Sequence, residues 1–258
     1  MKRGFSKIGF MAALVVSAFG SAGVASAQQF NWDGFYAGVE GGLGHGSSDM
    51  NHLGDTFTPT GPGPFVPDTT PGGPTDPKLS GGLFGAHIGF MRQMNGLVLG
   101  LDGAWDWTNI KGTTHRANPD GSTPDFDVAV DSLAMINGRV GVANGRWLAY
   151  ATGGVAVASV KAKVSGGDGA GGTFENRDTG QTHVGWDAGA GLSYAATDSI
   201  LIGLEYDHVD LGNKDHKLTD VNNPAGYAMF AVDPQIDVVK ARLSFKFGAR
   251  EPEHEPLK

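Results

Sequence analysis

Eight segments of the chain alternate apolar residues with small or polar residues at a period of two. This period puts successive side chains on opposite faces of an extended backbone, so each segment is predicted to be a β-strand with one apolar face. Glycine, which destabilises helices, occurs 42 times in 258 residues and strengthens the all-β prediction. The alternating segments are residues 35–43, 83–91, 97–108, 128–142, 147–164, 184–194, 200–207 and 239–247.

The connections between these segments are alternately short and long. Tight turns are expected around 93–96, 143–145 and 195–199, and the first two contain Asn-Gly, which favours two-residue hairpins. A soluble β-sandwich has the same strand alternation, but short turns at one end and long loops at the other are typical of outer-membrane barrels. We therefore predict an all-β fold, a closed eight-stranded antiparallel transmembrane β-barrel with short periplasmic turns and four long extracellular loops.

The alternation also assigns faces to particular residues. Val130 is in phase with the apolar set of Ile136, and Val160 and Val164 form the apolar side of their segment. The pair at 153–154, two glycines, is a candidate β-bulge that shifts the phase of its strand. Aromatic residues near strand ends predict an interfacial girdle. Its expected members are Tyr36, Trp105, Trp107, Trp147, Trp186, Tyr194, Phe245 and Phe247.

The N-terminus has the pattern of a secretory signal. A positively charged start, Lys2, Arg3 and Lys7, precedes an apolar run. The small residues Ala25 and Ala27 then occupy the positions that signal peptidase recognises. The apolar run is shorter than the roughly 20 residues that a membrane-spanning helix needs. Export with cleavage is therefore predicted, and an uncleaved N-terminal anchor is the alternative.

This pattern divides the chain into three parts. Residues 1–27 are expected to be the signal peptide, residues 28–248 the barrel and residues 249–258 a disordered periplasmic tail. The whole chain has a formal net charge of −8, and three of its cations lie in the signal, so the exported part is strongly acidic. Such a chain is not expected to bind nucleic acid. No cysteine is present, so no disulfide is available to stabilise the fold.

Five charged residues lie on the polar sides of their strands at similar distances from the predicted periplasmic ends. With a rise of about 3.3 Å per residue and a tilt of about 40°, five residues climb roughly 13 Å, which is near the middle of the membrane. An arginine can bridge two carboxylates and an unpaired buried charge is costly, so we predict one lumen network rather than separately hydrated charges. Arg242 is expected between Glu40 and Glu205, with Arg139 opposite Asp102. Candidates for a further cation are Lys240 and Lys246.

Several short motifs follow one another along the chain. In this order they resemble the alphaproteobacterial small outer-membrane surface antigens, a branch of the OmpA-like transmembrane and opacity-type porin family. The resemblance covers nearly all of the chain after residue 27 except the long loops. The motifs are 32–38 (WDGFYAG), 98–103 (VLGLDG), 138–141 (GRVG), 147–154 (WLAYATGG), 186–191 (WDAGAG), 204–206 (LEY) and 209–212 (VDLG).

The resemblance implies a closed barrel with both termini in the periplasm, and roles in envelope structure, host or environment contact and antigen display. It implies outer-membrane lipids, lipopolysaccharide and the barrel assembly machinery as partners, with a host surface molecule or haem as further candidates. In relatives the machinery reads the aromatic end of the last strand, which implicates Phe245 and Phe247 here. This chain departs from that pattern, because Gly248 and a charged tail follow Phe247.

No catalytic or metal-binding motif is recognised, neither a nucleophile elbow nor an HExxH sequence. We therefore predict a non-enzymatic surface protein without a cofactor. One alternative is a barrel that binds or takes up haem or another small solute, although eight strands enclose an interior that side chains can fill. Another is a lipid A-modifying enzyme with a serine–histidine pair drawn from His45, Ser47, Ser48 and His52.

Histidines and two loops complete the sequence predictions. A solitary loop histidine is usually solvated, so six histidines in or near loops are expected to be so, with haem ligation by one of them as the alternative. These six are His45, His52, His115, His183, His208 and His216, whereas His87 is expected to point into the barrel. Residues 46–79 hold seven of the 13 prolines and are predicted to be a solvated loop. The glycine-rich residues 166–172 are predicted to be a loop tip.

The signal pattern gives the first testable prediction. The mature protein is expected to begin at Gln28 and to sit in the outer-membrane fraction, where N-terminal sequencing reads its first residue. A closed barrel resists detergent, so the band should move on a gel when the sample is boiled. An unboiled sample that already runs as an unfolded chain would contradict the barrel.

Overall fold

The computed structural model describes residues 30–58, 61–67, 75–119 and 121–247. All secondary-structure elements in these ranges are β-strands. No helix in these ranges is long and apolar enough to cross a membrane. The predicted signal with Ala25 and Ala27, and the predicted tail, lie outside the described residues. The strands are β1 (Gly34–Thr58), β2 (Gly61–Pro67), β3 (Lys78–Met94), β4 (Leu97–His115), β5 (Thr123–Asn144), β6 (Trp147–Gly167), β7 (Thr173–Arg177), β8 (Gln181–Ala195), β9 (Ile200–Asp210), β10 (Lys214–Asp220) and β11 (Tyr227–Lys246).

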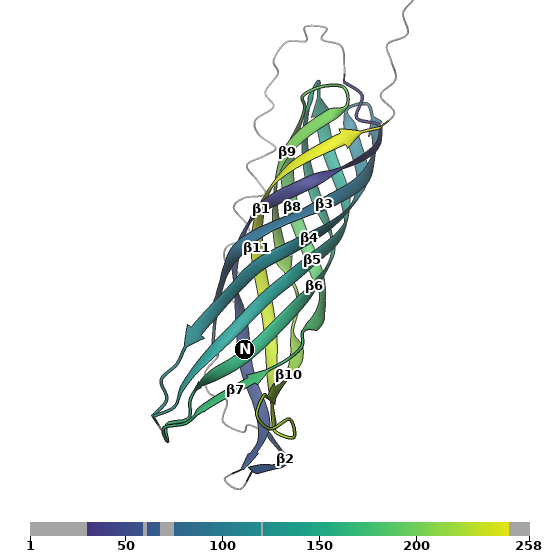
Figure 1. The fold of residues 1–258 in the computed structure, drawn as a ribbon. Helices are drawn as coiled ribbons and strands as arrows, with labels where there is room; N and C mark the ends of the chain where they lie inside the picture. The colour runs from purple at the N-terminus through teal and green to yellow at the C-terminus, as the bar shows by residue number, and fades with distance from the viewer. Residues whose placement is uncertain (1–29, 59–60, 68–74, 120, 248–258) are drawn as a thin grey trace, which may run out of the picture.

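Eight of these strands form a closed ring (Figure 1). Their order is β1, β3, β4, β5, β6, β8, β9 and β11, each pair is antiparallel, and β11 pairs with β1 to close the ring. The closing pair runs from Tyr36 opposite Lys246 to Asp55 opposite Ala228. Closure gives each of the eight strands a neighbour on both sides, which removes the open edges that would otherwise pair with other chains. The predicted all-β antiparallel sheet is confirmed.

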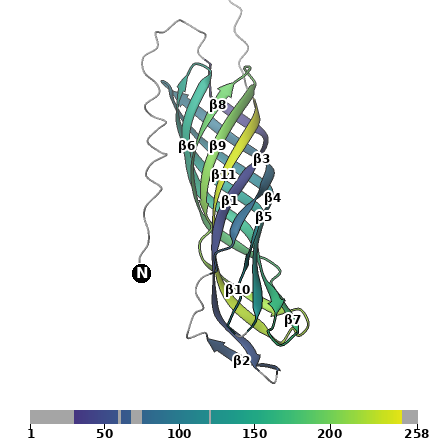
Figure 2. The same cartoon turned by 90° about the vertical axis from the view of Figure 1, so that its left-hand side faces the viewer.

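Short turns join β3 to β4, β5 to β6 and β8 to β9, as the sequence predicts. Asn95 and Gly96 have φ angles of 49° and 89°, and positive values at both positions are what a type I′ hairpin turn requires. Figures 1 and 2 show these turns at one end of an elongated molecule and β2, β7 and β10 at the other.

Most of the ring strands are longer than a membrane crossing needs. β1 has 25 residues, β5 has 22 and β4 has 19, against about 9–11 for a tilted membrane-spanning strand. We call the part of the ring that contains β8 and β9 the lower ring; Figures 1 and 2 draw it at the top. Beyond it the same long strands continue away from the short turns.

In this continuation two strands change partners. β6 pairs with β8 as far as Val160, then with β7 from Lys163 onward. β11 changes partners in the same way: it pairs with β10 as far as Val232 and with β9 from Gln235 onward. β7 and β10 pair with each other, so β1, β3, β4, β5, β6, β7, β10 and β11 make a second circuit, which we call the upper ring.

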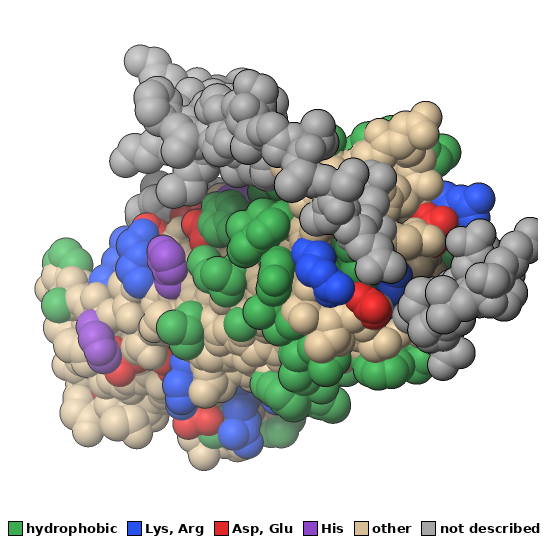
Figure 3. Space-filling model, turned by 90° about the horizontal axis from the view of Figure 1, so that it is seen from above, with side chains coloured by type: hydrophobic (Ala, Val, Ile, Leu, Met, Phe, Trp, Pro, Cys, Tyr) green, Lys and Arg blue, Asp and Glu red, His purple; other side chains and the backbone are tan. Residues whose placement is uncertain are grey.

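The two rings have opposite polarity. In the lower ring apolar side chains point outward, and Leu43, Leu101 and Ile136 are 74%, 68% and 73% exposed, while Glu40 and Asp102 are buried inside. The space-filling view shows such apolar side chains gathered on the outer surface, with charged side chains and histidines beside them (Figure 3). In the upper ring the apolar side chains are inside. This apolar core begins at the junction with the lower ring, level with the first residues of β8, and its members include Leu133, Ile110, Val160, Met50, Leu79, Phe126, Val128, Leu218, Phe230 and Val232.

A β-bulge in β5 produces part of this inversion. The register of β5 against β6 shifts between Val130 and Ser132, and a shift of one residue exchanges the two faces of a strand. Val130 is therefore buried inside, whereas Ile136 faces outward, so the sequence prediction that both share one face is wrong. The predicted bulge at 153–154 is also wrong, because these residues pair in regular register with Asn137 and Gly138.

Three other assignments from the sequence need correction. Tyr36 is 2% exposed and points inward, so it does not belong to the outer aromatic girdle. Val160 and Val164 form the apolar side of their segment, as predicted, but this side lines the apolar core and not the outer surface. Residues 46–79 are not a single loop, because β1 continues to Thr58 and β2 follows it.

The upper-ring core predicts a contrast between two leucines. Leu133 is fully buried there, so Leu133→Ala should leave a cavity and lower the free energy of unfolding by about 2–5 kcal/mol. Leu101 is 68% exposed on the outer face, and Leu101→Ala should cost only about 1–2 kcal/mol because no cavity forms. Urea unfolding of both variants in the same micelles measures the difference. Equal losses would mean that the upper ring has no packed core.

Candidate functional site

Arg242 on β11 holds carboxylates from three other strands inside the lower ring. Its Nη1 donates to Oε2 of Glu205 on β9 at 2.7 Å, and its Nη2 donates to Oδ1 of Asp102 on β4 at 2.8 Å. Its Nε lies 3.1 Å from Oε2 of Glu40 on β1. Because β4 is not a neighbour of β11 in the ring, the contact with Asp102 crosses the interior.

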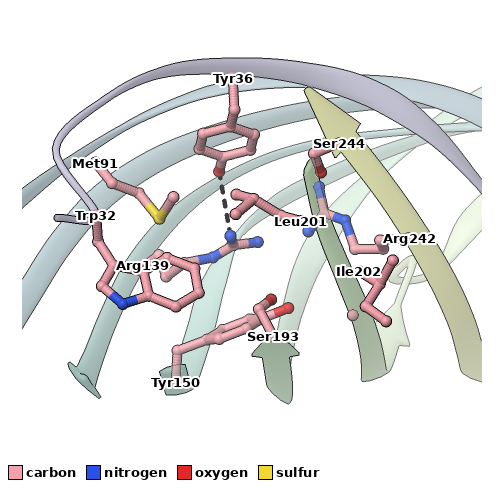
Figure 4. A pocket seen from close by; sticks show the side chains of 11 residues that line it. Trp32, Tyr36, Met91, Arg139, Tyr150, Ser193, Leu201, Ile202, Arg242 and Ser244 are labelled. Carbon is pink, nitrogen blue, oxygen red and sulfur yellow. Dashed lines mark hydrogen bonds between the residues drawn. The ribbon is translucent and has the colours of Figure 1, made fainter. Parts of the chain in front are cut away.

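Arg139 on β5 approaches the same carboxylates from the opposite wall. Its Nη2 lies 3.1 Å from Oε2 of Glu205 and 3.8 Å from Oδ2 of Asp102. The Tyr36 hydroxyl accepts from Nη1 of Arg139 at 3.2 Å and donates to Oδ2 of Asp102 at 2.6 Å. Figure 4 shows Tyr36 and Arg139 facing each other within the ring. The tyrosine thus shares this carboxylate oxygen with Nη2 of Arg242, which also donates to it, at 3.0 Å.

Tyr150 on β6 has a matching role on the other side of Arg139. Its hydroxyl donates to Oε2 of Glu205 at 2.7 Å, and its ring lies under the guanidinium carbon of Arg139 at 4.1 Å. Both tyrosines lie across a glycine of the next strand. A Cβ on Gly89 would come within 2.3 Å of the Tyr36 hydroxyl, and one on Gly191 within 2.4 Å of the Tyr150 ring. Only glycine leaves room for these rings.

Lys240 and His87 extend the network around Glu40. The Lys240 Nζ lies 3.2 Å from Oε1 of Glu40, 3.3 Å from Oε1 of Glu205 and 3.1 Å from Oδ2 of Asp207. His87 Nδ1 lies 2.9 Å from Oε2 of Glu40, and its Nε2 is hydrogen-bonded to the Ser244 hydroxyl at 2.7 Å. Lys240 is 1% exposed, so its ammonium depends on these carboxylates in place of water.

Below this network an apolar cap closes the end with the short turns. Trp32 is fully buried, its Nε1 donates to the Gly145 carbonyl at 3.3 Å, and its backbone N–H donates to Oε1 of Gln93 at 2.9 Å. The cavity between the cap and Arg139 has a volume of about 10 Å³ (Figure 4). That is about the space one water molecule needs, so the interior is filled by side chains at this level.

The family of the chain follows from comparison with known proteins. A family model described as the outer membrane protein beta-barrel domain matches residues 11–228. The chain belongs to this family. It is an outer-membrane protein, and the ring is its β-barrel.

The barrel has curated relatives in the genus Brucella. It is similar to the 31 kDa outer-membrane immunogenic protein of Brucella melitensis biotype 1, with 27% identity over 245 residues that cover 94% of this chain and 95% of that protein. The 25 kDa outer-membrane immunogenic protein of Brucella abortus biovar 1 is 28% identical over 204 residues, 78% of this chain and 76% of that protein. These findings confirm the resemblance to alphaproteobacterial surface antigens.

A solved structure with a similar course of the chain is the outer membrane protease OmpT from Escherichia coli. It is 11% identical, with 86% of this barrel protein and 99% of OmpT covered and a TM-score of 0.49. This likeness is too low to carry an argument about function.

The structure brings together all five residues that the sequence analysis placed in the lumen of the barrel: Glu40, Asp102, Arg139, Glu205 and Arg242. Lys240 also joins them, whereas Lys246 lies at the capped end, where it donates to the Asn31 carbonyl. We call the five with Tyr36, Tyr150 and Lys240 the lumen network. The sequence reasoning did not find the tyrosines, or the buried carboxylates of Asp106, Asp187 and Asp207 on the side of the network away from the short turns. Strand alternation does place these three aspartates on the lumen side.

Other sequence candidates fall into different surroundings. Ser48 is buried and His45 exposed, so they lie on opposite faces of β1. His183 and His216 are 1% and 0% exposed and contact each other, so the expectation that they are solvated is wrong. The predicted loop tip at 166–172 forms the turn between β6 and β7.

The two aromatic residues assigned to assembly lie on the outer face at the capped end. Phe245 and Phe247 are each 51% exposed, and their rings meet edge to face with centroids 5.1 Å apart. Phe247 continues the closing pair beyond β11, because its N–H donates to the Phe35 carbonyl at 2.8 Å. Their reading by the assembly machinery remains a prediction.

The lumen network predicts different costs for two cation deletions on β11. Arg242→Met leaves Glu40, Asp102 and Glu205 buried without their shared cation, so the free energy of unfolding should fall by about 3–5 kcal/mol. Lys246→Met removes one hydrogen bond to a backbone carbonyl and should cost about 1 kcal/mol. Urea unfolding in micelles measures both values. An Arg242→Met protein as stable as Lys246→Met would mean that the three acids do not depend on Arg242.

Proposed function

We propose that the barrel is a non-catalytic surface protein, in which the lower ring crosses the outer membrane and the upper ring projects into the external medium. The observation that carries this proposal is the opposite polarity of the two rings. An apolar exterior around a charged interior suits lipid, and a polar exterior around an apolar core suits water. One chain is thereby matched to two solvents along its length.

The exterior of the upper ring supports the assignment to water. Lys161 lies 2.6 Å from Asp131 across the β5–β6 pair, and Lys163 lies 3.9 Å from Glu175 on β7. Such partly exposed ion pairs are ordinary on a hydrated surface and would be costly against hydrocarbon. The ring therefore offers a charged wall, together with its connecting turns, for contact with the environment or a host.

The filled interior supports a structural role for the barrel and is not suited to the passage of a solute. The lumen network spans the barrel from β5 to β11, and the cap with Trp32 lies beneath it. A diffusing solute would have to separate Arg242 from its carboxylates, which are held at 2.7–3.1 Å. We assign no catalytic step and no cofactor, and His45 and Ser48 cannot act as a serine–histidine pair because they lie on opposite faces of β1.

Two further parts of the proposal follow from relatives. The Brucella relatives carry the word immunogenic in their names, which favours an exposed, antigenic role for the upper ring. The exposed ends Phe245 and Phe247 favour recognition by the barrel assembly machinery. Lipopolysaccharide is the lipid that the barrel would meet where the two rings join.

Cysteine labelling on intact cells tests the orientation, because the natural chain has no cysteine. Asp168 lies exposed in the turn beyond β6 of the upper ring, and Asn144 lies exposed in the short turn at the other end. A membrane-impermeant maleimide should label Asp168→Cys on intact cells. It should label Asn144→Cys only after the outer membrane is broken.

The lysed sample is the control, since both single-cysteine proteins must react there if they are folded and present. Labelling of Asn144→Cys on intact cells, with Asp168→Cys protected, would overturn the proposed orientation.

A further inference from the structure

Three buried polar side chains meet where the two rings join. His183 near the start of β8 is 1% exposed, and His216 on β10 is fully buried. The Asp178 side chain, in the turn between β7 and β8, is 3% exposed. The cluster lies beside the point where β6 exchanges β8 for β7, and Asp178 also accepts from the N–H of Ala162 there at 3.1 Å.

The hydrogen bonds of the cluster form a chain. His183 Nε2 lies 2.9 Å from His216 Nε2, and His216 Nδ1 bonds to Oδ2 of Asp178. His183 Nδ1 lies 3.3 Å and 3.2 Å from the carbonyl oxygens of Leu211 and Gly212. The two ring centroids are 5.2 Å apart, which is the N–N distance plus about one ring radius on each side, so the two Nε2 atoms point at each other.

The partners of these nitrogens fix where the protons are. Carbonyl oxygens only accept, so His183 must carry a proton on Nδ1, and a carboxylate likewise requires one on Nδ1 of His216. Two neutral rings in this state would direct two lone pairs at each other across 2.9 Å. One additional proton between the rings turns this repulsion into a hydrogen bond, and Asp178 balances its charge.

We propose that the junction of Asp178, His216 and His183 is a pH-sensitive lock that holds β10 against β8 with a single shared proton. At neutral pH the shared proton joins the two imidazoles. In acid a second proton places N–H against N–H, the bond between the histidines breaks, and β10 is released from β8. The upper ring then loosens while the lower ring remains closed.

The surroundings set the direction of the effect. His183 lies outside the last exposed apolar side chains of β8, and burial lowers its pKa below the ordinary value. The carbonyls of Leu211 and Gly212 oppose this shift, and the charges of His216 and Lys214 on β10 add to it. Asp178 is the facing anion, with Lys161 of β6 near it. Since a lowered pKa means that the unfolded chain binds the second proton more readily, the lock weakens as the pH falls below the ordinary histidine pKa of about 6.5.

A metal ion between the imidazoles of His183 and His216 is a weaker interpretation of their close approach. No group of three or more metal-ligating side chains is found among the described residues, and structural metal sites need about four ligands. The separation of 2.9 Å is also that of a hydrogen bond.

Hydrogen exchange of the full-length barrel in micelles tests the lock. After correction for intrinsic exchange, the amides of β10 should open about tenfold more often for each pH unit below 6.5, while those of the β3–β4 pair in the lower ring stay unchanged. In His183→Gln, β10 should be equally protected at pH 7.5 and pH 5. The control is His115→Gln, which removes an exposed histidine from β4 and should keep the wild-type acid response.

Nitrogen NMR of the wild-type histidines gives a second readout that needs no variant. At pH 7.5 one ring of the buried pair should be charged and the other neutral. Two neutral rings, pH-independent protection of β10, or an acid response that persists in His183→Gln would each overturn the lock. Protection of β10 by added Zn²⁺ at pH 7.5, absent in His183→Gln, would assign the gap to a metal and overturn it as well.

The lock can respond to the pH of the external medium only if the upper ring is exposed there, as the proposed function states. The exchange measurement in micelles does not depend on orientation. Failure of the lock and failure of the surface labelling are therefore separate outcomes.

Discussion

The barrel depends on pairing the charges that its narrow interior cannot hydrate. Arg242 is the centre of this arrangement, because its guanidinium meets carboxylates from β1, β4 and β9 at 2.7–3.1 Å. A buried ion pair adds little net stability over an apolar filling, but removing one partner is expensive. The network therefore specifies which strands may face one another. A slip of β11 by one residue would turn Arg242 to the outer face, deprive Glu40 of its arginine and leave Asp102 and Glu205 to Arg139.

The opposite polarity of the two rings has two local causes: β5 changes its phase between them, whereas β4 keeps its phase and changes the inward residue type from Asp102 to Ile110. β5 has a bulge between Val130 and Ser132, and the register of β4 against β5 shifts between Trp107 and Ile110. On one side of these irregularities apolar residues face out, and on the other side Ile110 and Val130 face in. A bulge is thus the local feature that exchanges the inner and outer faces of β5 while the strand keeps both neighbours.

Much of this could be predicted from the sequence, and the reasons for the failures are specific. Alternation and the Asn-Gly turns predict the antiparallel sheet, and counting residues from the turns places Arg139 and Arg242 at one height. The phase change could not be predicted, because alternation before and after a bulge looks the same and only its register with the next strand shows the shift. Tyr36 was misassigned for a related reason, since an aromatic residue near a strand end suits either a membrane interface or a lumen with a glycine opposite.

His183 and His216 were missed for another reason. They are 33 positions apart and belong to strands that the sequence reasoning treated as one strand and one loop. Their meeting depends on the exchange of partners by β6 and β11, which is a property of the whole sheet. No local sequence pattern indicates this exchange, so only the three-dimensional course of the strands brings the two histidines together.

The cap around Trp32 has a consequence for the order in which the molecule is made. Trp32 is near the N-terminus, so it leaves the inner membrane early, yet its indole bonds to Gly145, 113 positions later, and Asn31 bonds to Lys246, 215 positions later. Contacts between such distant positions form late, because long stretches of chain must be placed first. The segment that is exported among the first therefore cannot complete its contacts before β11 is in place, because β11 supplies Lys246.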